Sequence, residues 1–380
     1  MKIAILADPI DNQRGGVHVY TRELVKALLH QDRENDYLLV REKNQPEFPG
    51  ATSMAVPPKG PGLLYRALRM FLLIPRRLRQ AQVDVVVEPA HFGPFNLPKR
   101  VKRVTVIHDL TPLLFPQYHL WHSQLLQRLF LKRILKKSSL VISNSRHTTQ
   151  DILRFFPFLA GRVVTAHLGV GPSLKETTSQ AYLEQLGLKP GYWLSVGTIE
   201  PRKNGVRLLE AYQRFRASGG VAAPLIVAGQ RGWKAGAFYE ALEQHPYRQD
   251  IILTGFVPDD ALPELYSHAM ALLYLSEYEG FGLPVLEALT CGCPVICADN
   301  SSLPEVGGTV AYYADCRDTE TVAQHMKAIA GLSPPDRASL KAKALAWARQ
   351  FSWADHAEAC LKGLQKLSIE TTSPIGRKPN

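Results

Sequence analysis

Short runs of apolar, mostly β-branched residues recur along the whole chain, and segments with helical spacing separate them. In the first half these runs are residues 2–8, 37–41, 83–88, 104–110, 140–145 and 163–170. In the second half they are residues 192–196, 225–228, 251–256, 271–276, 294–298 and 310–314. Runs that are apolar on both faces and alternate with helices are typical of parallel sheets, which helices cover on both sides. The two series therefore predict an α/β protein with two doubly wound domains.

The length of 380 residues suits two domains, since domains commonly hold about 100–200 residues. We expect a first domain over residues 1–172, a second over 173–352, a C-terminal helix over 353–368 that packs back on the first domain, and a flexible tail over 369–380. No apolar run reaches the ~18–20 residues that cross a bilayer. Residues 1–8 are too short for a signal peptide, and five cysteines are few for a disulfide scaffold. We therefore expect a cytoplasmic protein.

Positive charge is concentrated in the first domain. Residues 1–172 hold 25 lysines and arginines against 12 acidic residues, a net charge of +13, whereas residues 173–380 hold 20 against 22, a net charge of −2. This asymmetry indicates an acidic partner for the first domain. Nucleic acid is disfavoured, because the chain carries no recognised nucleic-acid motif and its aromatic residues do not interleave with the basic stretches.

Two basic stretches with helical spacing, residues 63–79 and 119–137, contain no acidic residue. Basic amphipathic helices suit an anionic membrane surface, here the inner face of the cytoplasmic membrane. The alternative is that their apolar faces belong to the core and their cations are ordinary solvated residues. We expect Pro75 to kink or end the first of these helices.

Ligands of open parallel sheets bind outside the carboxyl ends of the strands. Gly15 and Gly16 follow the first predicted strand and open a helix, where amide groups can approach a phosphate, although a flexible turn explains them equally well. Arg202 and Lys203 follow the first strand of the second domain and precede a helix. Because cations are disfavoured at a helix N-terminus, we expect a bound anion such as a diphosphate to compensate them. The alternative is a solvated charge pair.

The most specific segment is residues 279–287, which read Glu-Gly-Phe-Gly-Leu-Pro-Val-Leu-Glu. Pro284 suits the first position of a helix, so the glycines form the strand-to-helix turn. Glu279 then lies in a loop and Glu287 in the first turn or so of the helix. Two carboxylates around a phosphate-binding turn suit the hydroxyl groups of a sugar and a ribose. The helix dipole offers another reason for Glu287, but not for Glu279.

This segment resembles the Glu-x7-Glu motif of the retaining GT-B glycosyltransferases of family four, which include bacterial mannosyltransferases. Other segments follow in the family's order: residues 15–16, 107–110, 197–204, 254–258, 301–306 and 351–353. The resemblance covers nearly the whole chain. It implies the GT-B fold, with two Rossmann-like domains facing a central cleft, the first binding the acceptor and the second the nucleotide sugar.

The resemblance also implies a role for each candidate residue. The donor phosphates would be bound by Gly15, Gly16, Arg202, Lys203, Phe281, Gly282 and Leu283. Glu287 would bind the ribose, and Gly255 and Phe256 the base. Glu279 would contact the transferred sugar, and His108 would lie beside the reacting carbon, so these two are the expected catalytic residues.

Metal-dependent transferases hold their cation with an Asp-x-Asp pair, and this chain has none. We therefore expect no metal and no cofactor, with cationic side chains and helix N-termini stabilising the leaving group. Cys291, Cys293 and Cys297 lack the spacing and the histidine of a metal site, so buried small residues explain them better.

The expected reaction is retaining transfer of a hexose from a nucleotide-diphosphate sugar to a saccharide or lipid-linked acceptor in cell-surface polysaccharide or lipopolysaccharide biosynthesis. Residues 197–204 most resemble mannosyltransferases, which favours GDP-mannose as the donor. A UDP-sugar-dependent glucosyl-, galactosyl- or N-acetylhexosaminyltransferase fits the same motifs. Two other interpretations stay open. One is a non-catalytic scaffold that binds nucleic acid or a membrane, and the other is an epimerase or phosphorylase of the same architecture.

Overall fold

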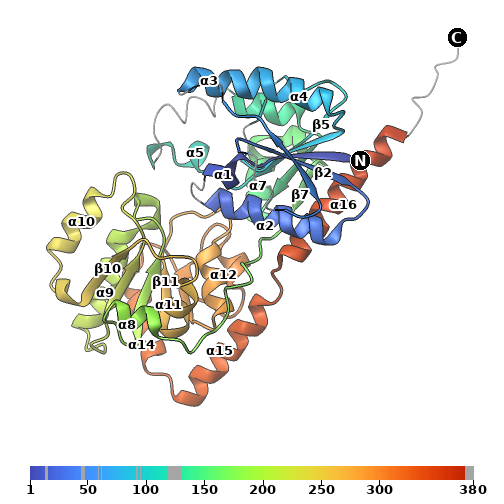
Figure 1. Ribbon diagram of the computed structural model, residues 1–380. Helices are drawn as coiled ribbons and strands as arrows, with labels where there is room; N and C mark the ends of the chain where they lie inside the picture. Colours follow the sequence, from blue (N-terminus) through green and yellow to red (C-terminus); the bar gives the residue numbers. More distant parts are fainter. Residues whose placement is uncertain are drawn as a thin grey trace, which may run out of the picture. The chain divides into compact units, whose positions relative to one another are not determined.

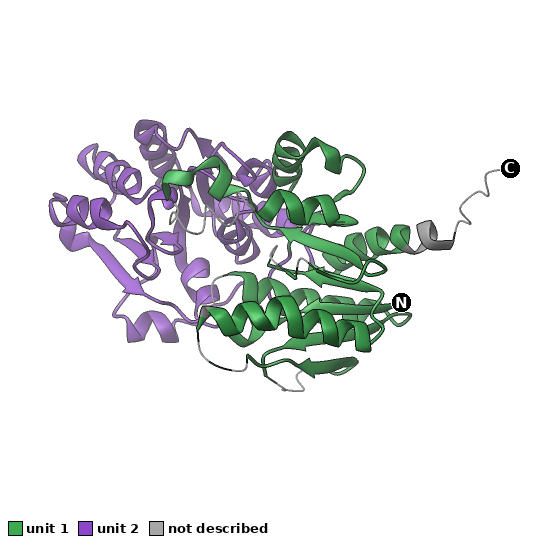
Figure 2. Cartoon of the chain, turned by 90° about the horizontal axis from the view of Figure 1, so that it is seen from above, with its two compact units in different colours: residues 1–168, 353–380 green, residues 169–352 purple. Residues whose placement is uncertain are grey.

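The computed structural model describes residues 1–12, 16–43, 48–58, 60, 62–90, 93–94, 96–118 and 130–372. The chain forms two compact units, the first made of residues 1–168 and 353–380 and the second of residues 169–352 (Figure 2). The first border lies four residues before the expected end of the first domain at residue 172. No helix among the described residues is long and apolar enough to cross a membrane.

The described residues of the first unit form a seven-stranded, entirely parallel sheet in the order β3-β2-β1-β4-β5-β6-β7 (Figure 1). Its strands are β1 (Lys2–Leu6), β2 (Asp36–Arg41), β3 (Ala51–Ala55), β4 (Val85–Glu88), β5 (Lys102–Ile107), β6 (Leu140–Ser143) and β7 (Val163–Thr165). Its described helices are α1 (Asp8–Asn12), α2 (Gly16–Gln31), α3 (Leu63–Leu68), η1 (Arg69–Leu73), α4 (Ile74–Gln80), α5 (Thr111–Leu114), η2 (Pro116–Tyr118), α7 (Arg146–Phe155), η3 (Pro157–Leu159) and α16 (Trp353–Thr372).

The C-terminal helix α16 packs against α2, β6 and β7, so it belongs to the first unit. Gly363 marks the contact, because a Cβ atom there would lie 2.8 Å from Leu140 of β6. The helix continues to Thr372, four residues past the expected end at 368. Residues 373–380 of the expected tail lie outside the described residues.

The second unit is a six-stranded parallel sheet in the order β10-β9-β8-β11-β12-β13. Its strands are β8 (Tyr192–Val196), β9 (Leu225–Ala228), β10 (Ile251–Gly255), β11 (Ala269–Tyr274), β12 (Val295–Ala298) and β13 (Tyr312–Ala314). Its helices are α8 (Ala181–Gln185), η4 (Pro201–Lys203), α9 (Gly205–Ala217), α10 (Gly236–Glu243), η5 (Arg248–Asp250), α11 (Leu262–His268), α12 (Leu283–Thr290), α13 (Leu303–Gly307), α14 (Thr319–Ala330) and α15 (Pro334–Ala348).

Both sheets reverse their strand order once, between β1 and β4 in the first unit and between β8 and β11 in the second. At such a reversal the chain crosses over to opposite faces, which leaves a crevice outside the carboxyl ends of the two strands. The residues that follow these four strands are therefore the ones placed to meet a ligand.

The first basic helix does not end at Pro75, which was one of the two outcomes that we expected there. The backbone stays helical from Leu63 to Gln80 through the π-helical turn η1, and α4 begins just before the proline. Proline lacks the N–H that would bond to the carbonyl four residues earlier. That carbonyl, on Phe71, accepts a hydrogen bond from Asn96 Nδ2 at 2.6 Å instead.

Candidate functional site in each unit

Lys203 and Glu279 come together at the strand reversal of the second unit. Lys203 ends the short helix η4 after β8, and Glu279 lies in the loop after β11. Lys203 Nζ donates to Glu279 Oε1 at 2.6 Å, and both side chains are largely buried. Burial alone would raise the pKa of Glu279, but Lys203 and Arg202 outweigh it and lower that pKa to about 2. Glu279 is therefore a carboxylate at neutral pH.

Arg202 completes this cluster from the other side. Its Nη1 lies 2.9 Å from Glu279 Oε2, and its Nη2 lies 2.8 Å from Glu200 Oε1. Two cations thus face two carboxylates of the same unit. Glu200 and Glu279 already compensate Arg202 and Lys203, so the two cations do not need a bound anion. Diphosphate binding by these cations stays a prediction. An incoming diphosphate would have to share these cations with Glu279.

Tyr274, the last residue of β11, is a member of the cluster that the sequence did not single out. Its hydroxyl donates to Glu279 Oε1 at 2.9 Å and accepts from Lys203 Nζ at 2.5 Å. The side chain is buried, and the ammonium also lies 4.7 Å from the ring centre. From sequence alone, a tyrosine at the end of a buried strand is interpreted as a core residue. Only the structure, in which Lys203 and Glu279 contact its hydroxyl group, shows that Tyr274 belongs to the site.

The loop that carries Glu279 is held by the segment after β12. Ser302 Oγ donates to the backbone carbonyl of Glu279 at 2.9 Å, and the backbone N–H of Glu279 donates to Ser301 Oγ at 3.0 Å. Ser301 itself has a left-handed backbone, with a φ of 52°. This contact gives a structural reason for the serine pair within residues 301–306.

Gly282 is the N-cap of α12 and adopts a φ of 98°, which side chains other than glycine rarely accept. A Cβ atom there would also lie 2.7 Å from Leu303 Cδ2. Leu283 begins the helix and Pro284 is its second residue, one position later than expected. The side chain of Phe281 is buried against Phe351, with ring centres 6.0 Å apart, so only its backbone can serve a ligand.

Glu287 lies beyond the first turn of α12, later than we expected. The helix dipole acts within the first turn and therefore does not explain this carboxylate. Burial raises its pKa to about 6, and Tyr266 holds it by donating to Oε2 at 2.8 Å. Glu287 stays a candidate for binding a ribose hydroxyl.

The expected base-binding residues lie at the carboxyl end of β10, two strands away from β8 in the sheet. Gly255 ends the strand with a φ of 70°, and Phe256 is 64% exposed. An aromatic ring with this exposure is available for stacking. In the first unit, Gly16 opens α2, whereas Gly15 lies outside the described residues.

His108 follows β5 in the first unit and is held by its neighbours. Its Nε2 contacts the carbonyl oxygen of Pro89 at 2.7 Å, and since a carbonyl only accepts, Nε2 carries the hydrogen. Burial lowers its pKa, so the ring is neutral at pH 7. Asp109 accepts from the backbone and hydroxyl groups of Thr111, the first residue of α5.

Tyr20 of α2 connects His108 to the C-terminal helix. Its ring meets that of His108 edge to face, with centres 4.6 Å apart, and its hydroxyl lies 3.1 Å from Nε2 of the buried His356 on α16. The carbonyl oxygens of Ala166 and His167 contact the other nitrogen of His356 at 3.0 and 3.1 Å. That nitrogen therefore donates, and Nε2 accepts from Tyr20.

A cavity of about 290 Å³ lies at the strand reversal of the first unit. It is lined by Leu6, Asp8, Pro9, Asn12, Val17, Met70, Glu88, Pro89 and Ala90. Asp8 and Glu88 follow or end β1 and β4, and Pro89 is the residue whose carbonyl binds His108. Burial raises the pKa of Glu88 to about 7. Apolar walls with a few carboxyl groups suit a small polyhydroxylated ligand.

The three neighbouring cysteines are buried thiols in and beside α12 and β12. Burial raises the pKa of Cys291 to about 12 and raises the pKa of Cys293 and Cys297 still further above the ordinary value. Across the described part of the chain, no three His, Cys, Asp or Glu side chains gather as metal ligands.

Two family models match the two halves of the chain. The model described as Glycosyltransferase Family 4 matches residues 14–174, and the one described as Glycosyl transferases group 1 matches residues 180–345. The sequence is 34% identical to O-antigen chain mannosyltransferase B of Escherichia coli over 93% of this chain and 96% of that protein. It is 28% identical to the serotype-specific mannosyltransferase WbdA of Escherichia coli over 70% of this chain and 34% of that longer protein.

Solved structures share the fold at low sequence identity. HepE of Anabaena, crystallised with UDP and glucose, superposes with a TM-score of 0.74 at 17% identity, over 96% of this chain and 100% of that one. Two doubly wound parallel sheets with this similarity define the GT-B fold, as the sequence predicted.

Proposed function

This chain belongs to glycosyltransferase family 4, and we propose that it transfers mannose from GDP-mannose to a saccharide acceptor of a surface polysaccharide, with retention of configuration and without a metal ion. The observation that carries the proposal is the cluster of Arg202, Lys203 and Glu279 at the strand reversal of the second unit. The similarity to O-antigen chain mannosyltransferase B and to WbdA supports mannose as the transferred sugar.

In the proposed reaction the bond between C1 of the sugar and the phosphate oxygen breaks, and its electron pair leaves with the nucleoside diphosphate. The acceptor hydroxyl forms the new bond to C1 on the same face, and its proton passes to the departing phosphate oxygen. Lys203, Arg202 and the N-terminus of α12 stabilise the negative charge of the leaving group. No group of the protein needs to be a covalent nucleophile.

Glu279 has a separate role in this proposal. Because its pKa is about 2, it is ionised at neutral pH and accepts hydrogen bonds from sugar hydroxyl groups instead of donating a proton. Its charge also stabilises the positive charge that develops at C1. Glu287 binds the ribose, Gly255 and Phe256 the base, and the backbone of residues 281–283 the diphosphate.

The first unit binds the acceptor in our proposal. The cavity beside Asp8 provides a partly exposed carboxylate for sugar hydroxyls between apolar walls. His108 is the proposed catalytic residue of this unit, and its link to Pro89 joins it to the cavity wall. The acceptor is a saccharide, free or linked to a lipid.

A donor panel tests the proposal. Purified protein is incubated with GDP-mannose, UDP-glucose, UDP-galactose or UDP-N-acetylglucosamine and a mannose-terminated oligosaccharide, and the product is examined by NMR. We expect transfer from GDP-mannose alone, with an α-linked product, in buffer that contains EDTA. Transfer from a UDP sugar would replace the donor assignment, a β-linked product would contradict retention, and loss of activity in EDTA would contradict metal independence.

A further inference from the structure

Exposed apolar side chains gather on one helix of the first unit. Of the nine large apolar residues that are exposed among the described residues, five lie between positions 64 and 72: Leu64, Tyr65, Leu68, Phe71 and Leu72. As whole residues, Leu64 is 78% exposed and Leu72 is 55% exposed. Single exposed apolar residues are ordinary on protein surfaces, but a contiguous group marks an interaction site.

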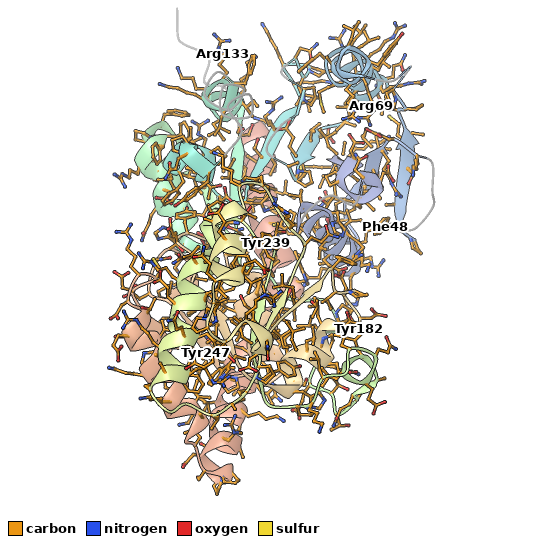
Figure 3. All side chains as sticks on the ribbon, turned by 90° about the vertical axis from the view of Figure 1, so that its left-hand side faces the viewer. Phe48, Arg69, Arg133, Tyr182, Tyr239 and Tyr247 are labelled. Carbon is orange, nitrogen blue, oxygen red and sulfur yellow. The ribbon has the colours of Figure 1, made fainter. Side chains whose placement is uncertain are left out.

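The same helix, residues 63–80, carries only positive charge. Arg66, Arg76, Arg77 and Arg79 are exposed, and the segment contains no acidic residue. We call the exposed side of this helix, formed by the five apolar residues and these four arginines, the basic apolar face. In Figure 3 the helix is seen nearly end-on beside the label of Arg69, with side chains projecting around it.

The inner side of the helix is fixed in the unit, so the basic apolar face stays exposed. Arg69 is buried and donates from both terminal nitrogens to Asp8 at 2.6 Å, and its Nε donates to the carbonyl of Val56. Ile74 and Leu78 pack in the core below. The π-helical turn at residues 69–73 joins α3 to α4, and such turns are frequent at functional sites.

The second basic stretch differs from this helix in the burial of its apolar residues. In its described part, residues 130–137, the apolar Leu131 and Leu135 belong to the core, and Lys132, Arg133 and the following lysines are exposed. Here the alternative interpretation, an apolar face in the core with solvated cations, is correct. On residues 64–72 it is not, because Leu64, Leu68 and Leu72 are exposed.

We propose that the basic apolar face docks on an anionic lipid bilayer, with the leucines in the headgroup and acyl boundary and the arginines on the lipid phosphates. Exposed apolar area combined with exclusively positive charge fits this occupant, because an apolar partner without negative charge leaves the arginines uncompensated. Met70 of the same helix lines the cavity proposed for the acceptor. If that assignment holds, docking brings the cavity close to saccharides carried on lipids.

Vesicle sedimentation of the full chain tests this inference without any transfer assay. Wild type should bind vesicles of phosphatidylglycerol and phosphatidylethanolamine and sediment poorly with pure phosphatidylcholine. The Leu64→Ser/Leu72→Ser variant should partition roughly tenfold less strongly, because an interfacial helix binds through its buried apolar area. In Arg76→Ser/Arg77→Ser, partitioning onto the anionic vesicles should fall about fivefold for each arginine removed.

Two matched variants give the controls. Val221→Ser removes an apolar side chain of 49% exposure from the second unit and should leave binding unchanged. Lys132→Ser/Arg133→Ser removes the same charge from the second basic stretch and should weaken binding less than Arg76→Ser/Arg77→Ser. Circular dichroism checks that all variants fold.

Three outcomes would overturn the inference. Equal, negligible binding to both vesicle types excludes a bilayer as the occupant. Equal losses in the Arg76/Arg77 and Lys132/Arg133 variants show that diffuse charge acts, not this helix. A dimer of the wild type that disappears in Leu64→Ser/Leu72→Ser, without vesicle binding, assigns the face to a second copy of the chain. Failure of the proposed donor activity leaves all three readouts unaffected.

Discussion

Glu279 is held by Arg202 and Lys203 of the short helix η4 and by Tyr274 at the end of β11. A buried carboxylate with this many partners has a fixed orientation, and its low pKa follows from the two cations. The sequence predicted both Lys203 and Glu279 as site residues, because each is a charged residue that follows a predicted strand. It did not predict that they pair with each other, because pairing depends on the distance between the ends of β8 and β11.

Tyr274→Phe tests whether the orientation of Glu279 matters. A hydrogen bond to a charged group contributes about 1.5–3 kcal/mol, so we expect kcat to fall roughly tenfold or more with a smaller change in KM. Tyr192→Phe is the matched control, because its buried hydroxyl donates only to the carbonyl of Leu265. An unchanged kcat in Tyr274→Phe would remove this residue from the site.

His356 makes the stability of the first unit depend on pH. Burial lowers its pKa to about 4, below the ordinary 6.5, so the unfolded chain binds a proton that the folded chain does not. The contribution of the neutral His356 to the free energy of unfolding is complete above pH 6.5 and is lost as the pH falls towards 4. We expect the free energy of unfolding to fall by about 2 kcal/mol between pH 7.5 and pH 5 because of His356 alone.

Urea unfolding of wild type and His356→Gln at the two pH values measures this effect. The variant should be less stable at pH 7.5, because Tyr20 and the backbone carbonyls lose their partner. The loss of stability on acidification should be smaller in the variant than in the wild type. Identical losses in the two proteins would contradict a buried neutral histidine.

At the scale of elements, the sequence located twelve of the thirteen described strands, because buried parallel strands are continuous apolar runs. It missed β3, an edge strand that reads Ala-Thr-Ser-Met-Ala and is only partly buried. It also did not show that the helix continues through Pro75, since the donor Asn96 lies 25 residues from the carbonyl it satisfies. Both misses come from tertiary contacts that local sequence does not contain.

The start of α12 is the element on which the donor site most depends. Gly282→Ala should destabilise the protein by about 1–3 kcal/mol, from the left-handed backbone and the clash with Leu303, and should weaken donor binding. Gly219→Ala is the control, because Gly219 has a φ of 83° with no atom near its Cβ position. It should lose stability through strain alone and bind donor normally, as thermal shift with GDP-mannose can show.

For the whole molecule, the order of motifs along the chain is sufficient to predict the family and the fold. The charge asymmetry between the halves predicted that the first unit meets an anionic partner, but it did not distinguish the two basic helices. Only the exposure of Leu64 and Leu72 does so. The donor's base and the acceptor depend on the shape of binding surfaces and stay proposals.

In the proposed function, Lys203 and its neighbours bind the pyrophosphate of the donor. Calorimetric titration of GDP-mannose into wild type, Lys203→Ala and Lys341→Ala tests it directly. Lys341 is the matched control, because its Nζ lies 2.6 Å from Glu176 in the same unit, as Lys203 does from Glu279. We predict that Kd rises at least tenfold in Lys203→Ala and stays unchanged in Lys341→Ala. Equal affinity of all three proteins would contradict the account.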